Sequence, residues 1–112
     1  MSAYVIAMIR VDNPEIYREY TSRTPPTVEK YGGKFIARGG EVDTLEGEPF
    51  NDRLVLLEFP SKQAVRDWHA DPEYQVALEY RKASSEARIL VIDGAADTHA
   101  PDAKVVKSRA SQ

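Results

Sequence analysis

The sequence predicts a single α+β domain whose strands and helices follow one another in the order β-α-β-β-α-β. Two observations lead to this prediction. Four short apolar segments rich in β-branched residues alternate with segments in which apolar residues recur at helical spacing. In addition, an Asn or Asp followed by Pro and Glu, a pattern that opens helices, occurs once in each half of the chain. A length of 112 residues fits one such domain with one hydrophobic core.

The first half of the chain is predicted to begin with a strand and a helix. Residues 3–11 carry apolar side chains on both faces, which is typical of a central strand that is covered on both sides. Asn13 is a suitable cap for the helix that follows, and Pro14 suits its first position. The Pro pair at 25–26 predicts that this helix ends or kinks near residues 22–24, before a second short helix.

The rest of the chain is predicted to add three strands and one interrupted helix. Residues 34–38 and 53–59 are predicted strands joined by an irregular loop. Ser61 is a suitable cap for the next helix, and Asp71 interrupts that helix and caps its continuation. Residues 88–93 form the last predicted strand.

This order of elements is that of a split βαβ, or ferredoxin-like, domain. It predicts an antiparallel four-stranded sheet with the first and third strands in the centre and both helices on one face. The other face would have no cover within one chain, although the strands are apolar on both sides. We therefore expect a homodimer in which two sheets face each other. Residues 1–94 are assigned to this domain and residues 95–112 to a polar C-terminal tail.

Composition excludes several classes of function. The chain has no Cys, which excludes disulfides, thiolate metal sites and a Cys nucleophile. The net charge is −3 and Lys and Arg are scattered, so no nucleic-acid partner is expected. No apolar run approaches the roughly 20 residues that span a bilayer, and the N-terminal segment lacks the features of a signal peptide. We expect a cytoplasmic protein with no membrane partner and no cofactor. The glycines around residues 32–40 do not have the spacing of a dinucleotide-binding fingerprint.

Several motifs in this chain resemble the family called domain of unknown function 1330. They are AYVIA, NPE-x-Y-x-x-Y, YGGKFIARGG, LEG, RLVLLEFPS and W-x-x-DPEYQ, and they follow one another over residues 2–94. The resemblance implies membership of the dimeric α/β-barrel superfamily, in agreement with the fold and the dimer expected above. It implies little chemistry, because the family has no settled activity.

Other members of that superfamily include cofactor-independent quinol-forming monooxygenases, muconolactone-type isomerases and haem-binding proteins. In the monooxygenases, a Trp on a helix and a Tyr shortly after it line the pocket, and Trp68 and Tyr74 are similar to that pair. The polar amide that those enzymes carry one turn before the Trp is missing, since Ala64 occupies this position. Nothing in the sequence marks His69 as an axial ligand of haem.

Glu58 and His69 are the candidate catalytic residues. Glu58 interrupts an apolar strand, so it lies either at the margin of the sheet or buried against a partner, for which Arg38 is the candidate. It is then either half of a structural ion pair at the dimer interface or a carboxylate with a raised pKa. His69 titrates near neutrality and is either a general base or a histidine at a helix end. His69, Asp71 and Glu73 lie at a helix break, so no metal site is expected.

Arg38, Trp68, Tyr74 and Arg81 are the candidate ligand-binding residues. Arg38 would orient an anionic substrate, and Trp68 and Tyr74 would stack on a planar one. The alternative for Trp68 is an anchor in the hydrophobic core. The restarted helix carries two stripes, one of Val76, Ala77, Tyr80 and Ala83 and one of Tyr74, Leu78 and Arg81. The second stripe would contact either the partner subunit or a ligand.

Two interpretations of the function remain open. In the first, the protein binds a planar, anionic small molecule between helices and sheet and resembles the monooxygenases or isomerases. In the second, it is a non-catalytic dimeric structural or interaction module in which Arg38 and Glu58 serve packing. A cavity of about 300 Å³ or more would favour the first interpretation. A filled interior with Arg38 paired to Glu58 would favour the second. Neither the reaction nor the substrate follows from the sequence.

Overall fold

The computed structural model describes residues 2–95, 105, 107 and 108 and confirms the predicted ferredoxin-like fold. The elements are β1 (Ala3–Val11), α1 (Pro14–Lys30), β2 (Lys34–Arg38), β3 (Arg53–Phe59), α2 (Lys62–Ala70), α3 (Pro72–Ser84) and β4 (Ser85–Asp93). The strands form an antiparallel sheet in the order β2-β3-β1-β4, so β1 and β3 are central as predicted. No helix in this part of the chain is long and apolar enough to cross a membrane.

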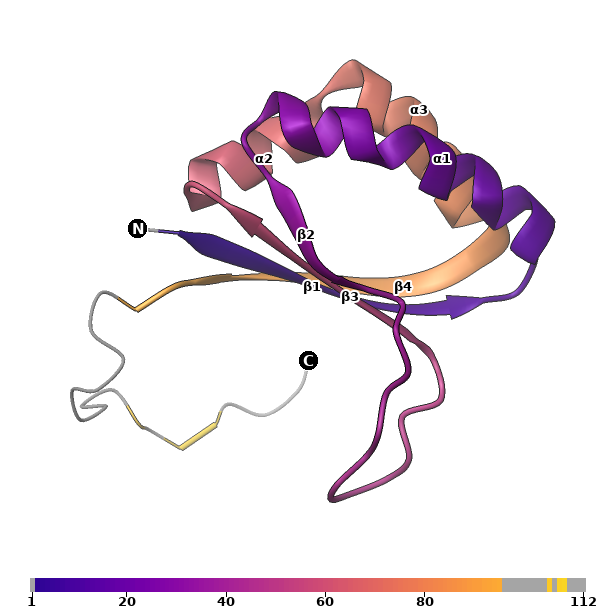
Figure 1. The fold of residues 1–112 in the computed structure, drawn as a ribbon, viewed down its shortest axis with the longest axis vertical. Helices are drawn as coiled ribbons and strands as arrows, with labels where there is room; N and C mark the ends of the chain where they lie inside the picture. The colour runs from indigo at the N-terminus through magenta and orange to yellow at the C-terminus, as the bar shows by residue number, and fades with distance from the viewer. Residues whose placement is uncertain (1, 96–104, 106, 109–112) are drawn as a thin grey trace.

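The three helices cover one face of the sheet, and the loop between β2 and β3 extends from the other side (Figure 1). Alternate strand residues therefore point toward the helices or away from them. In β1, Val5, Ala7 and Ile9 point toward the helices and are buried, whereas Ile6 and Met8 point to the open face. β4 begins at Ser85, three residues earlier than predicted, because it pairs with β1 as far as Val11. Most of the polar tail, including His99, lies outside the described residues, so the domain boundary at residue 94 stays a prediction.

The prediction that the first helix breaks near residues 22–24 is wrong, because α1 runs without interruption through its two internal Pro residues. Pro25 has no N–H to donate to the carbonyl of Thr21, one turn earlier. In its place, Nη2 of Arg38 donates to that carbonyl at 2.7 Å. The Arg38 side chain thus replaces one backbone donor that Pro removes. The hydroxyl of Thr24 donates to the Tyr20 carbonyl at 2.6 Å, a bond independent of the two Pro residues.

Asp71 fixes the break between α2 and α3, where the sequence predicts it. One carboxylate oxygen accepts hydrogen bonds from the backbone N–H groups of Glu73 and Tyr74 at 2.8 and 3.3 Å, which caps α3. The other accepts from Lys30 Nζ at 2.7 Å and from the Tyr31 hydroxyl at 2.6 Å. The break is therefore tied to the C-terminal end of α1.

The two predicted stripes on α3 differ in burial. Tyr74, Leu78 and Arg81 are all buried. The other stripe is divided, because Ala77 is fully buried and Tyr80 packs against the core, whereas Val76 is 53% exposed and Ala83 is exposed.

Candidate functional site

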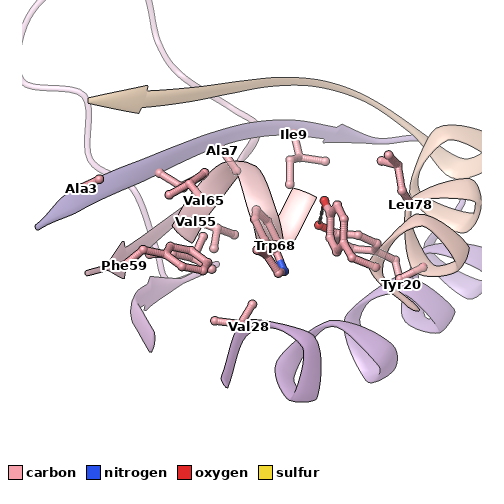
Figure 2. Close-up of a cluster of buried hydrophobic side chains, with 14 of the residues drawn as sticks. Ala3, Ala7, Ile9, Tyr20, Val28, Val55, Phe59, Val65, Trp68 and Leu78 are labelled. Carbon is pink, nitrogen blue, oxygen red and sulfur yellow. Dashed lines mark hydrogen bonds between the residues drawn. The ribbon is translucent and has the colours of Figure 1, made fainter. Parts of the chain in front are cut away.

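Trp68 of α2 lies in the aromatic part of the core, between the sheet and α1 (Figure 2). Its side chain is 2% exposed, and its indole N–H donates to the hydroxyl of Thr27 at 3.1 Å. The ring centroids of Phe59 and Tyr74 lie 5.2 and 4.2 Å from that of Trp68. Trp68 and Tyr74, which lie on either side of the break at Asp71, are thus direct neighbours.

A pair of buried phenols continues this aromatic cluster. The hydroxyls of Tyr20 and Tyr74 are 2.9 Å apart and hydrogen bonded, and their rings meet edge to face at 6.1 Å (Figure 2). Tyr17 lies 5.6 Å from Tyr20, centroid to centroid. Burial raises the pKa of both Tyr17 and Tyr20 above the ordinary value, so both phenols are neutral at physiological pH.

A cleft runs from this cluster to the surface between α1, β2 and β3. Its inner cavity, between the aromatic rings and the sheet, has a volume of about 30 Å³, close to the volume of one water molecule. An outer groove of about 450 Å³ follows, and the two share Tyr17, Thr21, Arg38 and Arg53 as lining residues. The inner cavity is far smaller than the roughly 300 Å³ that a ligand pocket usually has, whereas the groove is large enough.

Three arginines gather at the outer groove, namely Arg18, Arg38 and Arg53. Within residues 2–95, none of them forms an ion pair with a carboxylate. The Cζ atom of Arg38 lies 4.4 Å from the centroid of the Phe35 ring, and that of Arg53 lies 5.6 Å from that of Tyr17. Nε of Arg53 is buried and has no hydrogen-bond partner in the described part of the chain. A protein of net charge −3 thus concentrates unneutralised positive charge at this opening.

Arg81 packs behind the phenols and does not line the cleft. It is 7% exposed, its Cζ lies 5.5 Å from the centroid of the Tyr20 ring, and its Nε lacks a partner among the residues described. A buried cation without a carboxylate is unusual. Here the faces of aromatic rings replace part of the lost hydration.

Glu58 lies on the open face of the sheet, on the opposite side from this cleft. It accepts a hydrogen bond from the Tyr4 hydroxyl at 3.3 Å and pairs with Lys34 Nζ at 3.4 Å. Hydrogen bonds from Ser2 and then from Lys34 lower the pKa of its carboxyl. Of the two alternatives for Glu58, the structure favours the ion pair over the raised pKa, but the partner is Lys34 and not the candidate Arg38.

A β-bulge explains this error. Lys34 pairs with Glu58 and Phe35 with Leu57, but the register then skips Ile36, so Arg38 pairs with Val55. Regular alternation would place Arg38 on the same face as Lys34. The extra residue turns Arg38 to the helix face and into the cleft.

His69 lies on the exposed side of α2, in a separate surface groove of about 250 Å³ along β4. Its ring is 5.6 Å from that of Tyr74, on the far side of the aromatic cluster from the arginines. Partial burial, followed by the charges of Arg81 and Lys82, lowers its pKa. No group of three His, Asp or Glu side chains in the described residues could hold a metal ion.

The structure therefore brings together Arg38, Trp68 and Tyr74 of the predicted site. Sequence reasoning missed Arg53 as a member of this site. Counting back by two from Phe59 along β3 places residue 53 on the buried helix face, where an Arg is unexpected. It also missed the role of Tyr17 and Tyr20, which lie three apart on α1 and so share a face.

Comparison with known proteins shows the family of this chain. Residues 2–95 match the domain of unknown function DUF1330. The chain belongs to this family. The match covers nearly the whole described domain and confirms the resemblance seen in the sequence motifs.

Similarity to individual proteins is more distant. The chain is similar to heme oxygenase (staphylobilin-producing) 1 of Staphylococcus aureus, with 31% identity over 71 residues, which is 63% of this chain and 62% of that protein. The match thus spans less than two thirds of either protein.

Solved structures show the same fold at low identity. A protein of unknown function from Rhodopseudomonas palustris superposes with a TM-score of 0.71 at 23% identity, covering 86% of this chain and 84% of that one. A dimeric ferredoxin-like protein of unknown function from Jannaschia superposes with a TM-score of 0.68 at 15% identity, covering 84% of this chain and 100% of that one. SnoaB, a cofactor-independent oxygenase from Streptomyces nogalater, superposes with a TM-score of 0.59 at 16% identity, covering 88% of this chain and 98% of that one.

Proposed function

We propose that this protein binds a small planar anion in the cleft between α1 and the sheet. One observation carries the proposal: the outer groove collects Arg18, Arg38 and Arg53, and none of them has a carboxylate partner within residues 2–95. Guanidinium groups bind carboxylates through paired, charge-assisted hydrogen bonds. The anionic group of the ligand would lie in the groove, and its planar part would extend inward toward the aromatic cluster.

The roles of the side chains follow from their positions. Arg38 and Arg53 line both the inner cavity and the outer groove, so they would hold the anion where the two meet. Trp68 and Tyr74 would form the inner wall. Since the inner cavity holds only about one water, the flexible arginine side chains would have to move aside as the planar part enters.

Binding is better supported than catalysis. The residues that line the cleft include no Asp, Glu, His, Lys or Cys, so the cleft offers no general base other than a phenol. Glu58 and His69 lie outside it, and we leave them out of the proposed site. SnoaB is described as a cofactor-independent oxygenase, so consumption of oxygen is the first reaction to assay once a ligand is found.

Haem, suggested by the description of the staphylococcal relative, does not fit this cleft. The lining of the cleft contains no His, Cys or Met that could serve as an axial ligand. The hydroxyls of Tyr20 and Tyr74 are hydrogen bonded to each other, and Tyr17 lies against Arg53. His69 faces a different groove. We therefore assign no role to haem.

We also propose that the protein is a homodimer formed through the open face of its sheet. On this face Leu90 and Ile92 are 43% and 56% exposed, beside the apolar residues of β1 and β3. The Jannaschia protein of the same fold is described as dimeric, which supports this assembly. A cytoplasmic location and the lack of nucleic-acid and membrane partners stay predictions.

Calorimetric titration with benzoate and with uncharged benzamide tests the binding proposal. We expect saturable binding of benzoate alone. Replacing Arg53 by Gln, or Arg38 by Gln, should weaken it at least about tenfold, because each change removes a charge-assisted hydrogen bond. Arg10→Gln is the matched control, since Arg10 pairs with Asp12 and Glu86 away from the cleft.

A second candidate function is a non-catalytic interaction module, favoured by the small inner cavity and the 2% exposure of Trp68. The same titration separates the two. If benzoate and larger aryl carboxylates fail to bind, or if they bind equally well after both Arg changes, the proposed anion site is wrong and the module is the better description.

A further inference from the structure

We propose that the hydroxyl pair of Tyr20 and Tyr74 forms the inner end of the ligand site and donates a hydrogen bond to an uncharged oxygen of the ligand. The substrate class would then be planar carboxylates that carry a ketone or similar carbonyl at the end opposite the carboxylate. This inference rests on the proposed function and specifies what the anion must carry at its inner end.

The two hydroxyls together hold one more proton than their mutual hydrogen bond uses. Two O–H groups supply two protons, and the bond of 2.9 Å between them takes one. Neither hydroxyl donates to any other acceptor in the described residues. Tyr74 is fully buried and Tyr20 is nearly so, and buried polar groups normally find partners. One O–H is therefore available to a ligand.

Away from its outer end, where Tyr17 lies against Arg53, the other polar side chains along the inner cavity are already committed. The hydroxyl of Thr24 donates to the Tyr20 carbonyl, and that of Thr21 donates to the Arg18 carbonyl. The indole N–H of Trp68 donates to Thr27. The remaining walls toward the sheet are apolar, formed by Val5, Ala7, Ile9, Val55, Leu57 and Ile89. An oxygen that enters this cavity therefore meets the phenol pair as its donor.

The charges along the cleft indicate which end of the ligand lies here. The arginines Arg38 and Arg53 lie where the cavity meets the groove, so the carboxylate belongs at that end. Burial, reinforced by Tyr74, raises the pKa of Tyr20, which keeps this phenol a neutral donor across the physiological range. A neutral donor in an apolar cavity suits a carbonyl oxygen better than a second charged group, which would lose its hydration.

The tyrosines also form a continuous path between the two ends. The guanidinium of Arg53 lies against the ring of Tyr17, and the ring of Tyr17 lies against that of Tyr20. The hydroxyl of Tyr20 is hydrogen bonded to that of Tyr74. A flat ligand can lie along this path with an aromatic or conjugated body between carboxylate and carbonyl. With no carboxylate, imidazole or amine in the lining, the cleft would bind the ligand in the protonation state it has in solution.

Calorimetric titrations with 4-acetylbenzoate and 4-isopropylbenzoate test this inference. The two anions have nearly the same shape, but only the first carries a carbonyl. We expect the wild-type protein to bind 4-acetylbenzoate about tenfold more tightly, the size of one buried hydrogen bond. The double variant Tyr20→Phe/Tyr74→Phe should abolish this preference while 4-isopropylbenzoate still binds, because either single variant leaves one O–H free to donate.

Tyr31→Phe is the matched control, because it removes a hydrogen-bonded phenol hydroxyl that bonds Asp71 instead of lining the cleft. The Tyr31→Phe variant should keep the preference for 4-acetylbenzoate.

The infrared carbonyl stretch of carbonyl-13C-labelled 4-acetylbenzoate gives a readout that needs no variant. This stretch should move to lower frequency when the ligand binds to the wild-type protein.

The outcomes separate the two proposals. If neither benzoate binds, the anion site itself is wrong. If both bind with equal affinity, if the preference survives in the double Phe variant, or if the carbonyl stretch of the bound ligand does not shift, the phenol subsite is wrong while the anion site stands.

Discussion

Asp71 is the residue on which the geometry of the aromatic cluster depends. Its buried carboxylate caps α3 and binds Lys30 and Tyr31 at the end of α1. These hydrogen bonds, first that from Lys30 and then that from Tyr31, lower its pKa far below the ordinary value. One side chain thus sets both the angle at which the second helix restarts and its attachment to α1.

Replacing Asp71 by Asn should lower the melting temperature at pH 7 and reduce the sensitivity of the fold to acid. The depressed pKa means that the carboxylate stabilises the folded state above the ordinary Asp value of about 3.9, and that this stabilisation is lost as the pH falls below it. Asn retains the capping function, so the change isolates the charge. Thermal melts between pH 7 and pH 3 give the melting temperature of each protein as a function of pH. The melting temperatures of the wild type and of the Asp71→Asn variant should come closer together as the pH falls. A constant difference between them would contradict this role.

Trp68 is an anchor of the core as well as part of the cleft wall. Its burial and its contacts with Phe59 and Tyr74 predict that Trp68→Ala lowers the free energy of unfolding by roughly 3–5 kcal/mol. Trp68→Phe should cost clearly less, since it retains most of the apolar contact. Urea denaturation followed by circular dichroism measures both. A loss below about 1 kcal/mol for Trp68→Ala would show a loosely packed wall in place of an anchor.

At the scale of elements, the continuity of α1 depends on a strand that lies beside it. The helix contains Pro25 and Pro26, yet it continues to Lys30 because Arg38 of β2 donates to the carbonyl that Pro25 leaves without a backbone donor. Arg38 therefore links helix and strand in addition to lining the groove.

The contribution of this link can be measured by a double-mutant cycle. Arg38→Ala should destabilise the wild-type protein more than it destabilises a Pro25→Ala variant, because the alanine of that variant supplies the missing N–H to the Thr21 carbonyl. We expect a coupling free energy of about 0.5–1 kcal/mol by urea denaturation. Additive effects of the two substitutions would show that the Arg38 bond does not replace the lost backbone donor.

At the scale of the whole molecule, the protein has one covered and one open sheet face. The helices occupy the first face (Figure 1). The second face presents Ile6 between Leu56 and Leu90 across three neighbouring strands. A continuous apolar surface of this kind usually belongs to an interface.

Leu56→Lys should convert the proposed homodimer to a monomer, because it places a charge within this apolar row, beside Ile6. Light scattering coupled to size-exclusion chromatography measures the mass directly. Val76→Lys on the exposed side of α3 is the control and should leave the mass unchanged. A wild-type protein that is monomeric at micromolar concentration would overturn the dimer.

The sequence by itself determined the elements and their order. Strand alternation in residues 3–11, the caps at Asn13, Ser61 and Asp71, and the apolar strand at 53–59 are local signals, and each lies where it was predicted. Such signals act within a few residues and are legible without a partner segment. The split βαβ order then restricts the sheet to one familiar arrangement.

Only the tertiary structure decided which side chains meet. A single bulged residue, Ile36, turns Arg38 away from Glu58 and into the cleft, and alternation along the sequence cannot show such a shift. Likewise, Arg53 and Tyr20 come together only when β3 packs under α1. Sites depend on contacts between segments far apart in the chain, so register and packing, which no local pattern encodes, determine the chemistry of the cleft.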